Sequence, residues 1–384
     1  MFATRYLNIQ LKSVLLSTYI GMIIYTPLIS TLLSAYSTAL NNRYVYIMLF
    51  FTVIIWLYKM TEKGNIMTQT LVAISFVYLV CCAIRQSGFS ILGNQDFYGL
   101  ILLLFAISLS CSDSFCSSAA DVARRMSCWI IIECITYFVI NLGAQIAKYG
   151  TILEIQGVYE YPHIFAYITV IIYSQLTLLD SRLVKILKIF CIALVLTSAV
   201  RSACLVLVII VACDFIHIKS LPKKTAYLSL GVIFGMIIIS STSILYEIPV
   251  LQKTFTANAA GDVTNGRGKF VEYAMRYFES TSKSNQIFGS SMKTVRNIMH
   301  RNTGLYIHAH NDFVNILVGY GAIALFLIIL LLVLVLAKTR SIAFILVLFL
   351  CMYYNGLYMY TVFVLCLPLV QLTIKRNIYE YTKI

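Results

Sequence analysis

Long apolar runs separated by short polar segments make up most of this chain. A helix of about 17–25 apolar residues is long enough to cross the hydrocarbon core of a bilayer. The pattern therefore predicts an all-α, polytopic integral membrane protein with about twelve spans and one large loop. The predicted spans lie at residues 13–36, 44–60, 66–84, 97–112, 127–147, 162–180, 183–199, 202–216, 225–245, 311–336, 341–354 and 356–373.

Composition agrees with this pattern and excludes several classes of protein. Hydrophobic residues occupy 60% of the 384 positions and charged residues 11%, and the mean hydropathy is +0.87. An ordinary soluble domain does not have this balance, so we expect residues 1–384 to form a single membrane domain. The chain contains no Walker A, G-x-G-x-x-G or G-x-S-x-G pattern, and a nucleotide-driven enzyme or a serine hydrolase is therefore unsupported.

The distribution of Lys and Arg predicts the orientation in the membrane. With the N-terminus in the cytoplasm, the inside segments carry seventeen of these residues and the short outside segments carry four. Because cytoplasmic loops of membrane proteins are enriched in Lys and Arg, both termini are predicted to be cytoplasmic. The net charge of +14 then reflects this bias, and we expect no nucleic-acid partner. The inside residues are Arg5, Lys12, Lys59, Lys63, Arg124, Arg125, Arg182, Lys185, Lys188, Lys219, Lys223, Lys224, Lys338, Arg340, Lys375, Arg376 and Lys383, and the outside residues are Arg43, Arg85, Lys148 and Arg201.

One large outer loop, residues 246–310, is predicted between the ninth and tenth spans. Residues 269–283 repeat aromatic side chains such as Phe270 and Tyr277 at helical spacing, which predicts a short amphipathic helix on the membrane surface. Thr264 or Asn265 is the expected cap of this helix. The loop is basic, and its cations are Lys253, Arg267, Lys269, Arg276, Lys283, Lys293, Arg296 and Arg301.

The cluster from His308 to Asp312 lies where this loop meets the tenth span. The partial positive charge of a helix N-terminus disfavours an imidazolium, so His310 is expected to be neutral near pH 7 and able to accept a proton from a hydroxyl group. Asn311 and Asp312 can hold that ring or bind substrate hydroxyls. The alternative is that His310 only caps the helix or lies at the membrane interface.

The spacing His308-x-His310-x-Asp312 also permits a metal site, to which His300 would add a ligand. A catalytic metal usually has more clustered ligands than this. We therefore expect neither a metal nor another cofactor.

Four further residues are candidates for binding substrate. Arg201 begins a predicted helix at the outer face, where a guanidinium and free N–H groups suit a phosphate; the alternative is an arginine that reaches lipid headgroups. Arg267 lies between two glycines, which permit close approach of a ligand, but it is equally consistent with a solvated loop residue. His163 at an outer helix start either lines a site or begins the helix, and Arg276 is a further cation of the large loop.

The motif around His310 resembles a known family. His310–Asn311, nine residues, Gly321, two residues and Ala324 are similar to the H-N-x9-G-x-x-G signature of the O-antigen ligase/polymerase superfamily, with Ala324 in place of the last glycine. The amino-acid sequence around His310 is more similar to the polymerase (Wzy) branch. The similarity extends to Thr197–Arg201 at a helix start and to Gly266–Arg267, and the span pattern matches across most of the chain.

This resemblance implies a metal-independent membrane glycosyltransferase of the GT-C type in the bacterial inner membrane, acting in lipopolysaccharide or other polysaccharide biosynthesis. Such an enzyme passes the growing glycan from undecaprenyl pyrophosphate to a fresh lipid-linked repeat unit at the periplasmic face. The resemblance implies that Arg201 and Arg267 bind the pyrophosphate and that His310 activates the acceptor. The remaining candidates, His308, Asn311, Asp312, His163 and Arg276, would then contact substrate.

Two alternatives remain at this point. The first is a ligase of the same superfamily, with lipid A-core as the acceptor. The second is a flippase or other transporter of lipid-linked oligosaccharides, against which the single dominant loop argues. A chain-length regulator and the flippase of the same pathway are possible partners, in addition to membrane lipid and the lipid-linked oligosaccharide.

Overall fold

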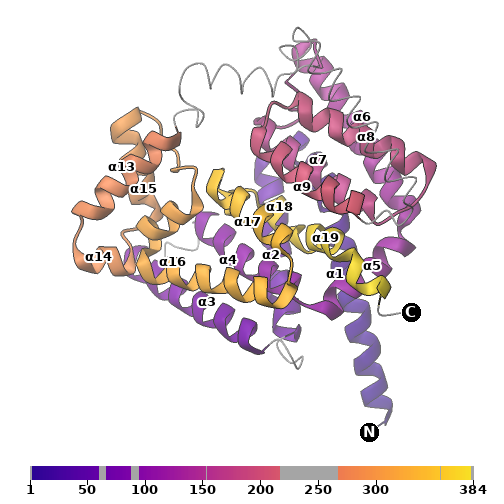
Figure 1. Cartoon of the computed structure of the whole chain (residues 1–384), viewed down its shortest axis with the longest axis horizontal. Coiled ribbons are helices and arrows are strands. Elements are labelled where there is room, and N and C mark those ends of the chain that lie inside the picture. Colours follow the sequence, from indigo (N-terminus) through magenta and orange to yellow (C-terminus); the bar gives the residue numbers. More distant parts are fainter. Residues whose placement is uncertain are drawn as a thin grey trace. The chain divides into compact units, whose positions relative to one another are not determined.

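The computed structural model describes residues 2–59, 66–87, 95–152, 154–216, 267–354 and 356–381, and every regular element in these ranges is helical (Figure 1). The all-α class is therefore confirmed. The chain divides into two compact units. Unit 1 comprises Met1–Tyr44, Asp113–Gly261 and Cys366–Ile384, and unit 2 comprises Val45–Ser112 and Asp262–Leu365.

Five helices among the described residues are long and apolar enough to cross a membrane, and the protein is thus a polytopic membrane protein. They contain Ser13–Tyr36, Thr38–Lys59, Ile66–Gln86, Ser127–Tyr149 and Asp312–Thr339. The broken pair Asp96–Ser110 and Asp113–Arg125 gives a sixth span if it crosses as one. Of the other predicted spans, 162–180, 183–199, 202–216 and 341–354 coincide with shorter helices, 356–373 is broken into several, and 225–245 lies outside the described residues.

Unit 1 is built around a central helix. Its helices are α1 (Phe2–Tyr36), α5 (Asp113–Arg125), α6 (Ser127–Tyr149), α7 (Pro162–Thr177), α8 (Arg182–Thr197), α9 (Arg201–Ile216) and α19 (Leu367–Tyr381). Every residue of α7 from Phe165 to Thr177 is buried, because α1, α6, α8, α9 and α19 all pack against it. Pro27 interrupts the hydrogen bonds inside α1, and the thiol of Cys366 donates to the carbonyl of Ile23 that the proline leaves unpaired.

The predicted break between residues 199 and 202 is confirmed. Helix α8 begins after Ser181, whose side chain accepts a hydrogen bond from the Val184 N–H at 3.2 Å. It ends at Thr197, and Ala199 takes a left-handed conformation with φ 57° before α9 begins at Arg201. This sharp turn explains why two apolar runs of 16 residues form separate helices instead of one long one.

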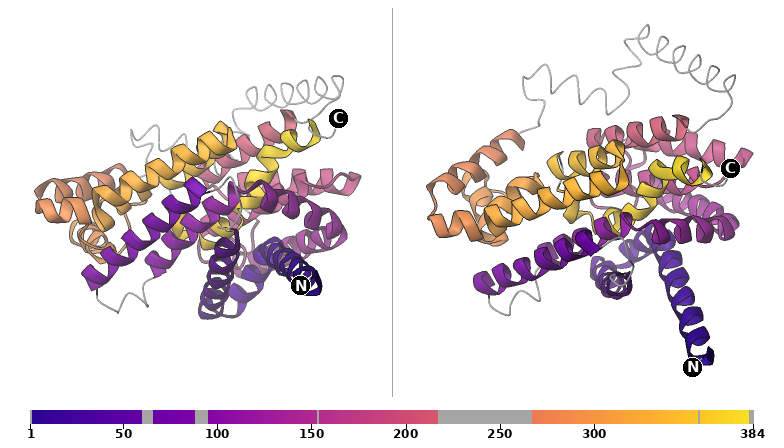
Figure 2. Two further views of the ribbon diagram at one scale, coloured as in Figure 1. Left: turned by 90° about the horizontal axis from the view of Figure 1, so that it is seen from below. Right: turned by 60° about the horizontal axis from the view of Figure 1, so that its bottom comes forward.

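Unit 2 gathers the helices of the large loop at the start of one long membrane helix. It contains most of α2 (Thr38–Lys59) with α3 (Ile66–Ser87), α4 (Gln95–Ser110), α13 (Arg267–Ser280), α14 (Lys283–Phe288), α15 (Met292–Thr303), α16 (Asp312–Thr339), α17 (Ile342–Tyr354), η2 (Leu357–Met359) and α18 (Thr361–Leu365). Helices α13, α14 and α15 all contact α16 (Figure 1). Helices α3 and α16 run side by side in both views of Figure 2.

Helix α16 is interrupted at Gly321, where the sequence predicted a continuous span. Gly321 has φ 86° and ψ 175°, which breaks the hydrogen bonding of the helix. The carbonyls exposed by this break find other partners. The N–H groups of Ser290 and Ser291 donate to Val318 and Gly319 at 2.9 and 3.1 Å. The side chains of Gln86 and Tyr78, on α3, donate to Gly319 and Tyr320 at 2.7 and 3.1 Å.

Two further predictions about elements need correction. Residues 356–373 do not form one helix but η2, α18 and the start of α19. The left-handed conformation of Gly356, φ 79°, starts the first turn, and Pro368, which has no N–H, is placed at the start of α19. Helix α5 was not predicted, because its polar composition does not resemble a span.

Candidate functional site

His310 occupies a constrained position at the entry to α16. Its φ of 53° is left-handed, which an ordinary side chain adopts only at a cost of about 1–3 kcal/mol. The next residue, Asn311, is the N-cap of α16, and its side chain accepts a hydrogen bond from the Val314 N–H at 3.2 Å. The helix therefore begins at Asp312, and His310 lies just before the cap instead of within the first turn.

The surroundings of His310 keep its imidazole neutral. Burial, followed by the positive charge of Arg267, lowers the pKa of His310 from its usual 6.5 to about 4. Its ring lies 6.0 Å from the ring of Phe270, measured between centroids. The expectation of a neutral His310 is thus supported, and the largest cause is burial.

Arg267 comes to this place because α13 begins there. The predicted amphipathic helix is confirmed over Arg267–Ser280, while its predicted caps, Thr264 and Asn265, lie outside the described residues. A guanidinium N–H of Arg267 donates to the carbonyl of Tyr354 at the end of α17, which fixes the position of the side chain. Arg267 and His310 therefore stand on two elements of unit 2 that contact each other, α13 and the start of α16.

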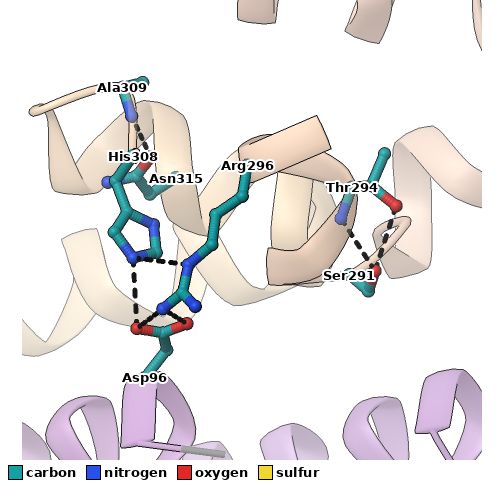
Figure 3. A network of polar contacts seen from close by, with 7 residues as sticks. All are labelled: Asp96, Ser291, Thr294, Arg296, His308, Ala309 and Asn315. Atoms are coloured by element: carbon teal, nitrogen blue, oxygen red, sulfur yellow. Dashed lines mark hydrogen bonds and ion pairs between the residues drawn. The ribbon is translucent and has the colours of Figure 1, made fainter. Parts of the chain in front are cut away.

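His308 belongs to a buried polar network (Figure 3). Arg296, on α15, donates through Nη2 to both carboxylate oxygens of Asp96 at 2.7 and 2.5 Å. Its Nε donates to His308 Nε2 at 3.0 Å, and His308 Nε2 also lies 3.2 Å from Asp96 Oδ1. The side chains of Asp96 and His308 are only 3% and 10% exposed. The network thus ties the first turn of α4 and the helix α15 to the segment that leads into His310.

Asp312 and Asn315 are also buried at the start of α16. Asp312 is fully buried; its Oδ2 accepts the Tyr358 N–H at 3.4 Å, and its Oδ1 has no partner among the described residues. The Oδ1 of Asn315 accepts the N–H of Ala309 at 3.2 Å. The first turns of α16 therefore anchor both the turn at Tyr358 and the segment before His310.

The remaining predicted residues stand on other helices or at other positions of α13. Arg201 and His163 are in unit 1, at the first residue of α9 and the second residue of α7, and each is partly exposed. No hydrogen bond or ion pair links the Arg201 guanidinium to another described residue. Arg276 is 71% exposed on α13 and pairs with Glu272 one turn away, a contact of little energetic weight at such exposure.

Six of the eight predicted site residues belong to unit 2, and all of these except the exposed Arg276 lie at the start of α13 or at the entry to α16: Arg267, His308, His310, Asn311 and Asp312. Sequence reasoning missed Asp96, and it named Arg296 only as a cation of the large loop. One signal was present, because Asp96 is an acid at the start of a strongly apolar run, where a charge needs a partner. Within the described ranges, no group of three or more His, Cys, Asp and Glu side chains is arranged to hold a metal ion.

Comparison with models of known protein families gives a match over part of the chain. Residues 186–329 match the family model described as Wzy_C: O-Antigen ligase. The match includes the start of α9 with Arg201, the helices α13 to α15, and the His310 motif as far as Gly321 and Ala324. No curated protein and no solved structure matches the chain.

Proposed function

We propose that this chain, which carries a domain of the O-antigen ligase/polymerase family at residues 186–329, is a glycosyltransferase that polymerises lipid-linked repeat units. Members of the family are glycan-transferring enzymes with lipid-linked substrates. The donor is the growing glycan on undecaprenyl pyrophosphate, and the acceptor is the outer sugar of a new lipid-linked repeat unit. One observation carries the proposal: a neutral, constrained His310 next to the Arg267 cation at the entry to a membrane helix.

In this proposal His310 is the general base. Its imidazole takes the proton of the acceptor hydroxyl as the oxygen attacks the anomeric carbon of the donor sugar. The bond between that carbon and the pyrophosphate oxygen breaks, and undecaprenyl pyrophosphate leaves with the bonding electrons. Arg267 binds the pyrophosphate, because a guanidinium matches phosphate oxygens with two parallel N–H groups.

The low pKa of His310 suits this role only when the donor is bound. An imidazole of pKa about 4 is a weak base at neutral pH, and a base is most effective when its pKa lies near the working pH. Part of the depression comes from the charge of Arg267. A bound pyrophosphate offsets that charge, so donor binding raises the pKa of His310 and activates the base only in the loaded enzyme.

The other assignments made from the sequence remain predictions. Arg201 is a predicted phosphate ligand of unit 1, and Asn311, Asp312, His308, His163 and Arg276 are predicted sugar contacts. We also propose twelve spans in a single membrane domain of the bacterial inner membrane, cytoplasmic termini and a periplasmic loop at residues 246–310. The chain-length regulator and the flippase of the pathway are proposed partners.

A ligase is the second candidate, and the name of the matching family, O-Antigen ligase, favours it. Purified protein incubated with lipid-linked repeat units alone distinguishes the two. A polymerase makes a ladder of longer lipid-linked glycans, whereas a ligase makes none until lipid A-core is added. In a deletion strain, core capped with a single repeat unit indicates a polymerase, and bare core with accumulated lipid-linked polymer indicates a ligase.

A further inference from the structure

Asp96 and Arg296 together occupy one ring nitrogen of His308, Nε2. The guanidinium of arginine is always protonated and has no acceptor, so the Nε contact with His308 Nε2 requires a lone pair on that nitrogen. If Nε2 instead carried a proton, the nitrogen could donate to Asp96 Oδ1 at 3.2 Å, but it could not accept the Arg296 N–H. Both contacts of Nε2, with Arg296 at 3.0 Å and with Asp96 at 3.2 Å, are within hydrogen-bond distance. His308 Nε2 is therefore occupied and cannot take a substrate proton.

The network also restrains the backbone on which His310 stands. The side chain of His308 is held by Arg296, and the backbone of Ala309 is held by Asn315 from the second turn of α16 (Figure 3). On the other side, Asn311 is fixed as the helix cap. His310 is the single residue between these anchors, and its left-handed φ of 53° persists only while both sides hold it.

We propose that Asp96 and Arg296 are positioning residues for His310, which act through His308 to hold the imidazole of His310 in its reactive place. This rests on the proposed function, in which His310 is the base. Asp96 orients Arg296 with a two-oxygen contact, Arg296 orients His308, and His308 sets the path of the chain into His310. The large loop and the membrane helix α4 are thereby connected to the reactive residue.

The test compares variants that keep or break the chain of contacts, all at wild-type membrane levels. In Arg296→Gln and Asp96→Asn the maximal turnover falls by about 100-fold, the loss expected for a displacement of about 1 Å at a reacting group. The KM for the donor stays unchanged, because Arg267 is untouched. His308→Gln keeps an acceptor for the Arg296 N–H and retains more activity than His308→Ala. Lys293→Gln, an exposed change one turn away on α15, has no effect.

A second readout does not require activity. Diethyl pyrocarbonate modifies neutral imidazoles, and peptide mapping gives the rate for each histidine. In the intact protein, Arg296→Gln and Asp96→Asn change the modification rate of His310, whereas Lys293→Gln does not.

The outcomes separate the two proposals. An inactive wild-type protein with an altered His310 rate in Arg296→Gln removes the proposed function but supports the positioning role. Wild-type turnover and an unchanged His310 rate in Arg296→Gln overturn the positioning role, even where the transferase activity is present. Equal loss in His308→Gln and His308→Ala also overturns it, because His308 would then act through its own imidazole.

Discussion

Two histidines that are only two positions apart have opposite environments. His308 is buried with its Nε2 occupied by Arg296, whereas His310 is partly exposed, strained and next to Arg267. The sequence singled out His310 because it directly precedes the predicted helix, but it did not show what surrounds either ring. Because the difference arises from residues outside the motif, the different environments of the two histidines become visible only in the folded protein.

The first prediction concerns pH. Because the pKa of His310 is depressed to about 4, the free enzyme keeps a neutral base well below pH 6.5, and kcat/KM stays flat until the pH approaches about 4. In the donor complex the pyrophosphate offsets Arg267, so the acidic limb of kcat lies at higher pH than that of kcat/KM. The two profiles are measured with purified protein and lipid-linked substrates.

The opposite order of the two limbs, or an acidic limb of kcat/KM near 6.5, contradicts this account of His310.

The lowered pKa of His310 also predicts an effect of pH on the stability of the protein. The unfolded chain binds the imidazole proton first, so the stability contributed by His310 is full above pH 6.5 and is lost as the pH falls toward about 4.

The second prediction concerns the arginines. Arg267→Lys and Arg201→Lys keep the charge but lose the paired N–H geometry, and turnover falls about 10- to 100-fold, since a charged hydrogen bond contributes about 1.5–3 kcal/mol. The alanine variants lose more. Arg301→Lys, an exposed change at the end of α15, is the matched control and retains activity. If Arg201→Ala still makes full-length polymer, Arg201 only contacts lipid headgroups.

At the scale of elements, the glycine of the His310 motif has a clear physical task. A Cβ on Gly321 would lie 2.1 Å from the Ile287 carbonyl oxygen, and its φ of 86° disfavours other residues. Gly289 is equally tight, since its Cβ would lie 2.3 Å from the Gly319 carbonyl oxygen. The end of α14 and the break in α16 can therefore touch through their backbones only because both positions are glycine.

The third prediction follows from this contact. Gly321→Ala separates α14 from α16, lowers the thermal stability of the purified protein and reduces activity. Gly143→Ala is the matched control, because a Cβ at Gly143 meets nothing within 4 Å and the residue lies in α6 with ordinary φ. Its stability is unchanged or rises by up to about 1 kcal/mol. Equal melting temperatures for the two variants contradict the proposed backbone contact.

The elements that the sequence predicted well carry strong local signals. Apolar runs predicted α2, α3, α6 and the start of α16, and aromatic periodicity predicted α13. The segment 356–373 was predicted wrongly, because its composition is apolar throughout while its breaks depend on Gly356 and on contacts with α4. Short helices such as α14, begun by the Ser282 cap, have too few residues for a periodic signal.

At the scale of the whole molecule, the missing information is long-range pairing. Asp96 and Arg296 are 200 positions apart in the chain, and no local pattern links an acid before α4 with a cation of the large loop. The motif at His310 and Gly321 was accessible from the sequence because its spacing is local. The sequence therefore predicted His310, the base of the proposed function, and missed Asp96 and Arg296, which we propose position it.

The fourth prediction tests the orientation of the chain. A phosphatase reporter that works only outside the cytoplasm is inserted after Lys283, an exposed residue at the start of α14, and is expected to be active. The same insertion at Asp180, an exposed residue between α7 and α8, is expected to be inactive. Activity at Asp180 and none at Lys283 reverses the topology and moves the site to the cytoplasmic face.

The most direct test of the central claim is the turnover of His310→Ala with purified protein and lipid-linked repeat units, measured together with donor binding. A positioned base contributes about 10²- to 10⁴-fold to rate, so polymerisation is nearly abolished. Donor affinity is unchanged, because Arg267 holds the pyrophosphate, and His308→Ala loses less than His310→Ala. EDTA leaves the wild-type rate unchanged. Equal losses in both histidine variants together with sensitivity to EDTA would contradict the general-base role and support a metal site instead.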